Sequence, residues 1–289
     1  MNEYYFLFAL GLIWIVFASI QDLRKREVAN WLNFSLIAIA LAYRAIYSLF
    51  YNDWEFFALG LAGFAMFFAI ANAFYYTKVF AGGDAKLLMG IGCVLPFESF
   101  FDFLAIGIGF VFILFLFGAV YSLFYSLYVA YLNGKRFSFE FKKRFFGNWK
   151  YLLIAVLIAL ISFFVIKEFY YALLVFLFVV FIPLLYVYLK AVECCMIKLI
   201  MPEKLTEGDW IEQDVRVNGK WIRKNVHGLS LKEIELLRKY KRRILVKEGI
   251  PFVPSFLFAF AFMVYAFLFL GLSAEGLASW LPAFFGGVF

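Results

Sequence analysis

The sequence predicts an all-α, multi-pass membrane protein: a bundle of about six to eight transmembrane helices with a small cytoplasmic α+β segment. The composition is 66% hydrophobic and 23% aromatic, with only 16% charged residues, whereas soluble domains are near half apolar and a quarter charged. Several stretches exceed about 18 apolar residues, the length that a helix needs to cross about 30 Å of hydrocarbon. Such a chain has too little polar surface to remain in water.

Hydropathy places the expected helices at 4–21, 30–51, 54–77, 85–96, 99–132, 151–166, 169–192 and 250–272. The fourth of these is short for a full crossing, and the fifth is long enough to project beyond the bilayer. The first apolar run follows Glu3 and has no basic segment before it, so we expect a retained helix rather than a cleaved signal. The closing stretch, Ala274–Phe289, is typical of an interfacial tail.

Basic residues predict the orientation of these helices, because cytoplasmic loops are rich in Lys and Arg. If the loop at 21–30 is cytoplasmic, then alternate loops near 77–86, 133–150 and 193–249 are cytoplasmic too. With Lys190 counted at the edge of the last of these loops, only Arg44 and Lys167, of the 27 Lys and Arg residues, lie elsewhere. The sequence therefore predicts an N-terminus outside the cell.

One polar segment, Pro202–Gly249, interrupts the apolar helices. It contains Asn218–Gly219, a dipeptide typical of hairpin turns. Ser230 is followed three residues later by Glu233, the pattern of a capping box at the start of a helix. We expect a small β-hairpin, then a helix, then a short strand at RILVK.

Cysteine and histidine patterns predict neither a metal site nor a disulfide framework. Cys93, Cys194 and Cys195 form no CxxC pair and show no zinc-ligand spacing with His227. No motif predicts a cofactor. The net charge of +7 could suggest nucleic acid, but its concentration in the cytoplasmic loops favours membrane topology instead.

Two acidic residues lie where acids are costly. Asp22 directly follows the apolar run FLFALGLIWIVFASIQ, and Asp84 lies in TKVFAGGDAKLLMG between two apolar segments. Ionisable groups at membrane depth are rare and usually mark a function or a pair. The predicted orientation puts both at the same membrane surface. Two adjoining carboxylates share one proton, which permits general acid–base hydrolysis without a metal or a covalent intermediate.

Local context suggests a role for each carboxyl group. Asp22 ends a helix, where the helix dipole disfavours negative charge, so it is the expected acid. Asp84 precedes a helix, where free N–H groups favour the carboxylate, so it is the expected base; coupling between the two makes this assignment dependent on the protonation scheme. Gly82 and Gly83 are expected to allow backbone conformations closed to other residues and the close approach of a substrate strand.

Other interpretations of these residues stay open. Taken singly, Asp22 fits an interfacial helix end, Gly82-Gly83-Asp84 fits a turn with an N-cap, and Lys86 fits an interfacial anchor. The two acids also fit a proton- or cation-coupled transporter. A third possibility is a non-enzymatic scaffold whose polar segment binds a partner.

The two aspartate segments together resemble the archaeal prepilin and preflagellin (prearchaellin) peptidases, which are GxGD-type intramembrane aspartic proteases. The first match is SIQDLRKREVANWLN and the second is AGGDAKLLMGIG, while GIPFVPSFLFAFAF is similar to the last helix of the archaeal branch. Ala81 stands where the first motif glycine is expected. The resemblance covers roughly residues 1–130 and the last helix.

The resemblance implies an aspartic endopeptidase that cleaves a short basic leader from pilin-like or archaellin precursors at the cytoplasmic face. Asp22 and Asp84 would be catalytic, and Gly82, Gly83 and Lys86 would bind substrate or shape the loop. The partners would be the precursors and the lipid bilayer, without nucleic acid, metal or cofactor, and the oligomeric state is left open. The cysteine-rich loop of the bacterial relatives is missing, so their N-methylation activity is not expected.

On this basis the chain divides into four segments. They are a catalytic transmembrane region with both aspartates at 1–132, a basic cytoplasmic loop and additional transmembrane hairpin at 133–201, the small cytoplasmic polar segment at 202–249, and a final transmembrane helix with an interfacial tail at 250–289.

Overall fold

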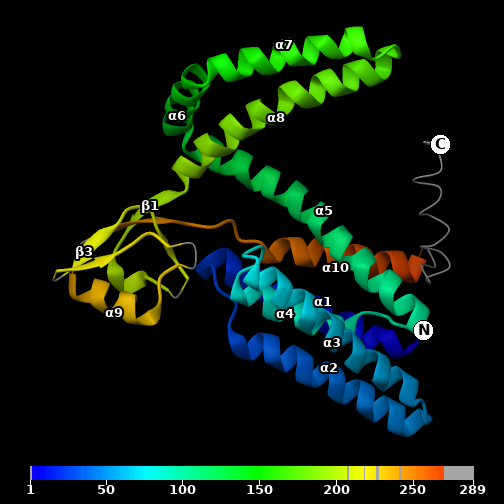
Figure 1. The fold of residues 1–289 in the computed structure, drawn as a ribbon. Helices are drawn as coiled ribbons and strands as arrows, with labels where there is room; N and C mark the ends of the chain where they lie inside the picture. Colours follow the sequence, from blue (N-terminus) through cyan, green and yellow to red (C-terminus); the bar gives the residue numbers. More distant parts are fainter. Residues whose placement is uncertain (1, 207, 218, 226–227, 241–242, 270–289) are drawn as a thin grey trace. The chain divides into compact units, whose positions relative to one another are not determined.

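The computed structural model describes residues 2–206, 208–217, 219–225, 228–240 and 243–269. It divides into two compact units, one formed by Met1–Ser122 with Pro251–Phe289 and the other by Leu123–Ile250. The predicted tail at Ala274–Phe289 and His227 lie outside the described residues. Each unit is described in turn (Figure 1).

The first unit is a bundle of helices, in which α1 packs against α2 and α10 while α4 packs against α2 and α3 (Figure 1). The helix expected to begin at residue 85 begins earlier, so Asp84 lies in its first turn instead of before it. The unit comprises α1 (Asn2–Lys25), α2 (Asn30–Tyr51), α3 (Trp54–Tyr76), α4 (Gly82–Val94), the first part of α5 (Phe100–Leu132), and α10 (Val253–Phe269).

Five helices among the described residues are long and apolar enough to cross a membrane, namely α1, α2, α3, α5 and α8 (Phe169–Cys195). The bent pair of α6 (Gly134–Gly147) and α7 (Trp149–Val165) makes a sixth if the pair is counted as one span. This confirms the multi-pass all-α class, at the lower edge of the expected number of spans. With 13 residues, α4 is too short to cross by itself.

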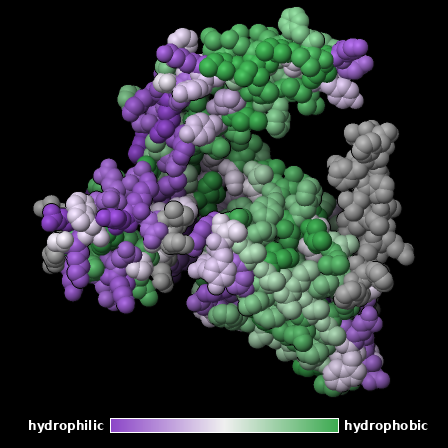
Figure 2. Space-filling view, viewed as in Figure 1, coloured by the Kyte–Doolittle hydropathy of each residue, from purple (hydrophilic) through white to green (hydrophobic). Residues whose placement is uncertain are grey.

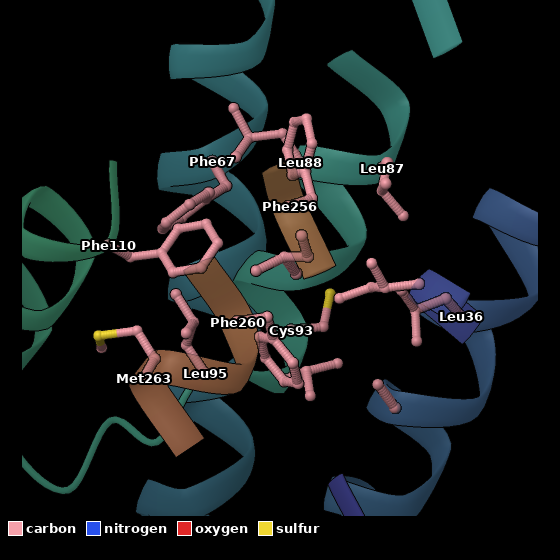
Figure 3. Packing of buried hydrophobic residues seen from close by; sticks show 14 of the residues in the cluster. Leu36, Phe67, Leu87, Leu88, Cys93, Leu95, Phe110, Phe256, Phe260 and Met263 are labelled. Carbon is pink, nitrogen blue, oxygen red and sulfur yellow. The ribbon is translucent and has the colours of Figure 1, made fainter. Parts of the chain in front are cut away.

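Hydrophobic side chains from every helix of the first unit meet in one buried core. Leu36 of α2, Phe67 of α3, Leu88 of α4, and Phe256 and Phe260 of α10 are all fully buried in it (Figure 3). Hydrophobic residues also cover much of the outer face that Figure 2 draws for this unit, as expected for helices that contact lipid.

Two glycines bring α3 and α4 into unusually close contact. A Cβ atom on Gly63 would lie 2.3 Å from the carbonyl oxygen of Gly92, and one on Gly92 would lie 2.6 Å from the carbonyl oxygen of Gly63. Small residues allow helix backbones to approach in this way inside membranes. A larger residue at either position would push α4, and with it Asp84, away from α3.

The second unit contains a helical hairpin and a small α+β domain. In the hairpin α7 packs along α8, and α6 packs against α8 as well. The segment 133–150, expected as a loop, instead forms α6 and the start of α7. The remaining elements are β1 (Ile197–Ile200), the 3₁₀ turn η1 (Pro202–Lys204), β2 (Trp210–Ile211), β3 (Val215–Val217), β4 (Lys220–Ile222), α9 (Leu231–Tyr240) and β5 (Ile244–Lys247).

The α+β domain confirms most of the pattern expected for the polar segment. β3 and β4 form an antiparallel hairpin, whose turn has Gly219 at a φ of 83°. The carboxylate of Glu233 accepts a hydrogen bond from the Ser230 N–H at 2.8 Å, which caps α9. RILVK contains β5, which pairs antiparallel with β1 and β2 in the order β1-β5-β2. β1 was not predicted, because its residues continue the apolar run of α8.

Candidate active site

Asp22 lies in the last turn of α1 and is only 6% exposed. Its Oδ2 accepts a hydrogen bond from the main-chain N–H of Val253, at 3.0 Å. Val253 is the first residue of α10, and the first N–H groups of a helix have no partner within that helix. The carboxyl group of α1 therefore caps α10 and receives the favourable field of its positive end. No pattern in the sequence predicted this contact.

Asp84 lies in the first turn of α4, and its Oδ2 accepts a hydrogen bond of 3.4 Å from the N–H of Ala81. This is the acidic half of a capping box, at a distance longer than usual. Burial raises the pKa of the Asp84 carboxyl above its ordinary range, and the charge of Asp22 raises it further. The two carboxyl groups therefore interact electrostatically, although they are far apart in the sequence.

An aromatic cluster holds the two aspartate segments together. Phe80, in the loop that precedes α4, has its ring centroid 5.6 Å from that of Phe252 and 5.7 Å from that of Phe256. Phe252 directly precedes Val253, which donates to Asp22. The same ring contacts thus fix the loop before Asp84 and the start of α10, which explains how the two segments converge.

The glycines before Asp84 do not have the conformational role expected of them. Neither Gly82 nor Gly83 has a positive φ, and an added Cβ would make ordinary contacts of 3.6–3.7 Å with Val28 and Tyr75. The expectation that their backbone conformations exclude other residues was therefore wrong. Ala81 has a φ of −71° and a ψ of 164°, which any residue can adopt, so alanine stands at the first motif position without strain.

Three polar side chains make hydrogen bonds at the starts of α2 and α4 and in the loop between α1 and α2. Lys86 Nζ donates to Asn30 Oδ1 at 2.7 Å, which ties the start of α4 to the start of α2. Gln21 Oε1 accepts from the N–H of Ala29 at 3.0 Å and so orders the loop between α1 and α2. Of these, only Lys86 was singled out from the sequence.

Asn33 is a fully buried amide beside the motif. Its Nδ2 donates a long hydrogen bond, 3.4 Å, to the carbonyl oxygen of Gly83. Its Oδ1 has no partner among the described residues, and a buried oxygen without a donor costs free energy. An Asn in the mostly apolar helix α2 was the available signal, and it was not used in the prediction.

None of the other places where a ligand or metal ion could bind adjoins Asp22 and Asp84 in the described residues. A surface pocket lined by Glu3, Asp53, Glu55 and Glu98 lies beside the start of α1, at the end of that helix remote from Asp22. Within the described part of the chain, no group of three or more His, Cys, Asp or Glu side chains could hold a metal ion. All three cysteines are free.

The region that forms this site is similar to a known class of proteins. Residues 9–123, which include both Asp22 and Asp84, match the sequence model of the type IV leader peptidase family. This match confirms the resemblance to prepilin and preflagellin peptidases that the two aspartate segments indicated.

Individual relatives come from archaea. Over 89 residues, 31% of this chain and 38% of the relative, the sequence is 32% identical to a preflagellin peptidase of Methanocaldococcus jannaschii. It is 29% identical over 93 residues, 32% of this chain and 40% of the relative, to a preflagellin peptidase of Methanococcus voltae. A preflagellin peptidase of Methanococcus maripaludis is 28% identical over 89 residues, 31% of this chain and 38% of that protein. The chain thus spans about two fifths of the length of these relatives. No solved structure matches the chain.

Proposed function

We propose that this protein is a membrane aspartic endopeptidase that removes a short basic leader from pilin-like or archaellin precursors at the cytoplasmic face of the membrane. The observation that carries the proposal is the convergence of the two aspartate segments: α1 packs against α4 and α10, Val253 donates to Asp22, and the adjoining Phe252 ring contacts Phe80 of the loop before α4. Both aspartates lie within the range that matches the type IV leader peptidase family. The names of the relatives support archaellin precursors as the substrate class.

The mechanism follows from one proton shared by two carboxyl groups. The ionised carboxylate removes a proton from water as the water oxygen attacks the scissile carbonyl carbon. The protonated carboxyl group donates a hydrogen bond to the carbonyl oxygen, and a proton is then delivered to the departing amine nitrogen as the C–N bond breaks. No covalent intermediate with the protein is required.

The contacts of each carboxyl group favour one assignment of these roles. The long hydrogen bond that Asp84 accepts, at 3.4 Å, compensates its charge poorly and favours it as the protonated acid, while the shorter bond that Val253 donates, at 3.0 Å, favours Asp22 as the ionised base. This is the reverse of the assignment from helix ends alone, because the donor to Asp84 is the distant N–H of Ala81, the residue before α4. The division of roles stays a prediction.

The distribution of basic residues supports the proposed orientation. Arg24 and Lys25 occupy the last turn of α1, next to Asp22, and basic residues mark cytoplasmic helix ends. The N-terminus would then lie outside, and both aspartates would lie at the cytoplasmic boundary. Leaders of such precursors are expected to be cut where their hydrophobic helix leaves the membrane, so a site at this depth fits the substrate.

The test is co-expression of the membrane protein with several candidate precursors, followed by measurement of leader removal. Asp22→Asn and Asp84→Asn are each expected to lower the processing rate by at least about 10³-fold, because each removes one half of the acid–base pair. Asp53→Asn is a matched control, since Asp53 caps α3 through the N–H of Phe56 and Asn caps equally well. It should process at the wild-type rate.

Two outcomes would contradict the proposal. Wild-type processing by either variant would remove that aspartate from the mechanism. Proton flux in proteoliposomes that disappears with either substitution, without any precursor cleavage by the parent protein, would favour the transporter interpretation.

A further inference from the structure

The second unit contains an amphipathic helix with no role in the proposed active site. α6 carries five basic residues and one acidic residue in 14 positions. The acid, Glu140, is paired with Arg144, at 3.7 Å. One side of α6 packs against α8, where the ring centroid of Phe137 lies 5.6 Å from that of Tyr188.

The outward side of α6 combines bare cations with exposed aromatic rings. Its members recur at helical spacing and are all exposed: Lys135, Phe139, Lys142, Lys143 and Phe146. The two rings are 66% and 69% exposed, which is costly in water for such large apolar groups. None of the three lysines has an ion-pair partner among the described residues. The described part of the chain therefore supplies no cover of apolar and negative character for this face.

The geometry of the hairpin indicates what covers this face. α6 meets α7 at a bend of 65°. α7 and α8 pack together as two apolar helices, and Figure 2 shows their drawn surface as hydrophobic, with hydrophilic residues gathered over α6 at one end and at the tip at the other. If the hairpin crosses the bilayer, the bend turns α6 away from the membrane normal and toward the membrane plane, at headgroup depth.

We propose that α6 is an interfacial helix that binds anionic lipid headgroups. Phe139 and Phe146 insert at the boundary between headgroups and acyl chains, while Lys135, Lys142 and Lys143 contact the lipid phosphates. Each cation near an anionic bilayer contributes about a fivefold preference. An acidic protein partner would satisfy the lysines but would leave the two exposed rings without an apolar cover. This inference does not depend on the peptidase function.

The test measures hydrogen–deuterium exchange of the full-length protein in nanodiscs of pure phosphatidylcholine and in nanodiscs with one third phosphatidylglycerol. Amides of α6 are expected to exchange at least about tenfold more slowly in the anionic discs, because headgroup binding holds the helix at the interface. Raising the salt concentration to about 0.5 M should remove most of this difference, because screening weakens contacts between exposed charges.

Variants separate lipid recognition from general membrane contact. Lys135→Gln/Lys142→Gln/Lys143→Gln should make exchange in α6 equal in the two lipids. The matched control, Lys232→Gln/Arg238→Gln/Lys239→Gln, changes three cations of α9 in the same unit and should leave the lipid dependence of α6 intact. Equal exchange of wild-type α6 in both lipids, or an undiminished lipid dependence in the α6 variant, would overturn the proposal.

Discussion

Buried charged groups lie near both ends of α4, but they differ in how fully the protein hydrogen-bonds them. Beyond its last turn, Arg44 of α2 is completely buried, and its three nitrogens donate to the carbonyl oxygens of Cys93, Leu95 and Phe56 at 2.7–2.9 Å. Its guanidinium also lies 4.5 Å from the centre of the Phe56 ring. Each of the three nitrogens of Arg44 thus has an acceptor within the protein itself.

At the other end of α4 the polar groups are left incompletely bonded. Asp22 receives one main-chain N–H, Asp84 receives one long hydrogen bond, and the Oδ1 of Asn33 receives none from the described residues. A buried charge that serves stability is saturated with partners, whereas one that serves chemistry needs open lone pairs for water and substrate. The contrast teaches that the number of hydrogen-bond partners, rather than the degree of burial, separates the structural charge of Arg44 from the candidate catalytic charges of Asp22 and Asp84.

The largest effect is expected from removing the saturated charge. Arg44→Met leaves three buried carbonyl groups without donors and should lower the free energy of unfolding by about 3–5 kcal/mol, measured by thermal unfolding in detergent. Arg44→Lys, which keeps the charge with fewer donors in a different geometry, should lose less. Stability of Arg44→Met equal to that of the parent would show that this end of the bundle does not depend on the hydrogen bonds of Arg44.

The second effect tests the single donor of Asp22. Val253→Pro removes the N–H at the first position of α10, where proline is otherwise well tolerated. A hydrogen bond to a charged group contributes about 1.5–3 kcal/mol, so processing should fall roughly 10- to 100-fold in the co-expression assay.

Val253→Ala is the control for this substitution, because it keeps the N–H while trimming the side chain. Its processing should exceed that of Val253→Pro by the same factor. Equal activity of the two variants would mean that the contact between α1 and α10 does not act on the chemistry.

The smallest effect is expected at Asn33, whose Oδ1 has no partner among the described residues. Asn33→Leu removes the orphan Oδ1 together with one long hydrogen bond, so the melting temperature should stay constant or rise slightly. Processing should nevertheless fall about 5- to 10-fold, because the carbonyl of Gly83, in the first turn of α4 beside Asp84, loses its side-chain donor. Ser35→Ala, on the same helix, provides the control, and unchanged processing by Asn33→Leu would count against a positioning role.

The sequence predicted the features that neighbouring residues determine. It did not predict those that depend on contacts between distant segments. Apolar length gave the membrane class, the Asn218–Gly219 turn gave the hairpin, and two acids in apolar surroundings gave the candidate pair. The hydrogen bond from Val253 to Asp22 could not be predicted, because every residue except proline has a main-chain N–H and the residue type therefore carries no signal. α6 was missed because its basic residues were interpreted only as a topology signal and its phenylalanines were not considered as a helical face.

The contact between Asp22 and Val253 joins the first helix of the chain to the last one described. The whole of the second unit, Leu123–Ile250, is translated between them. A nascent chain that has already inserted both aspartates therefore still lacks the group that fixes one of them. Under the proposed mechanism, Asp22 would receive its main-chain donor only once synthesis reaches α10.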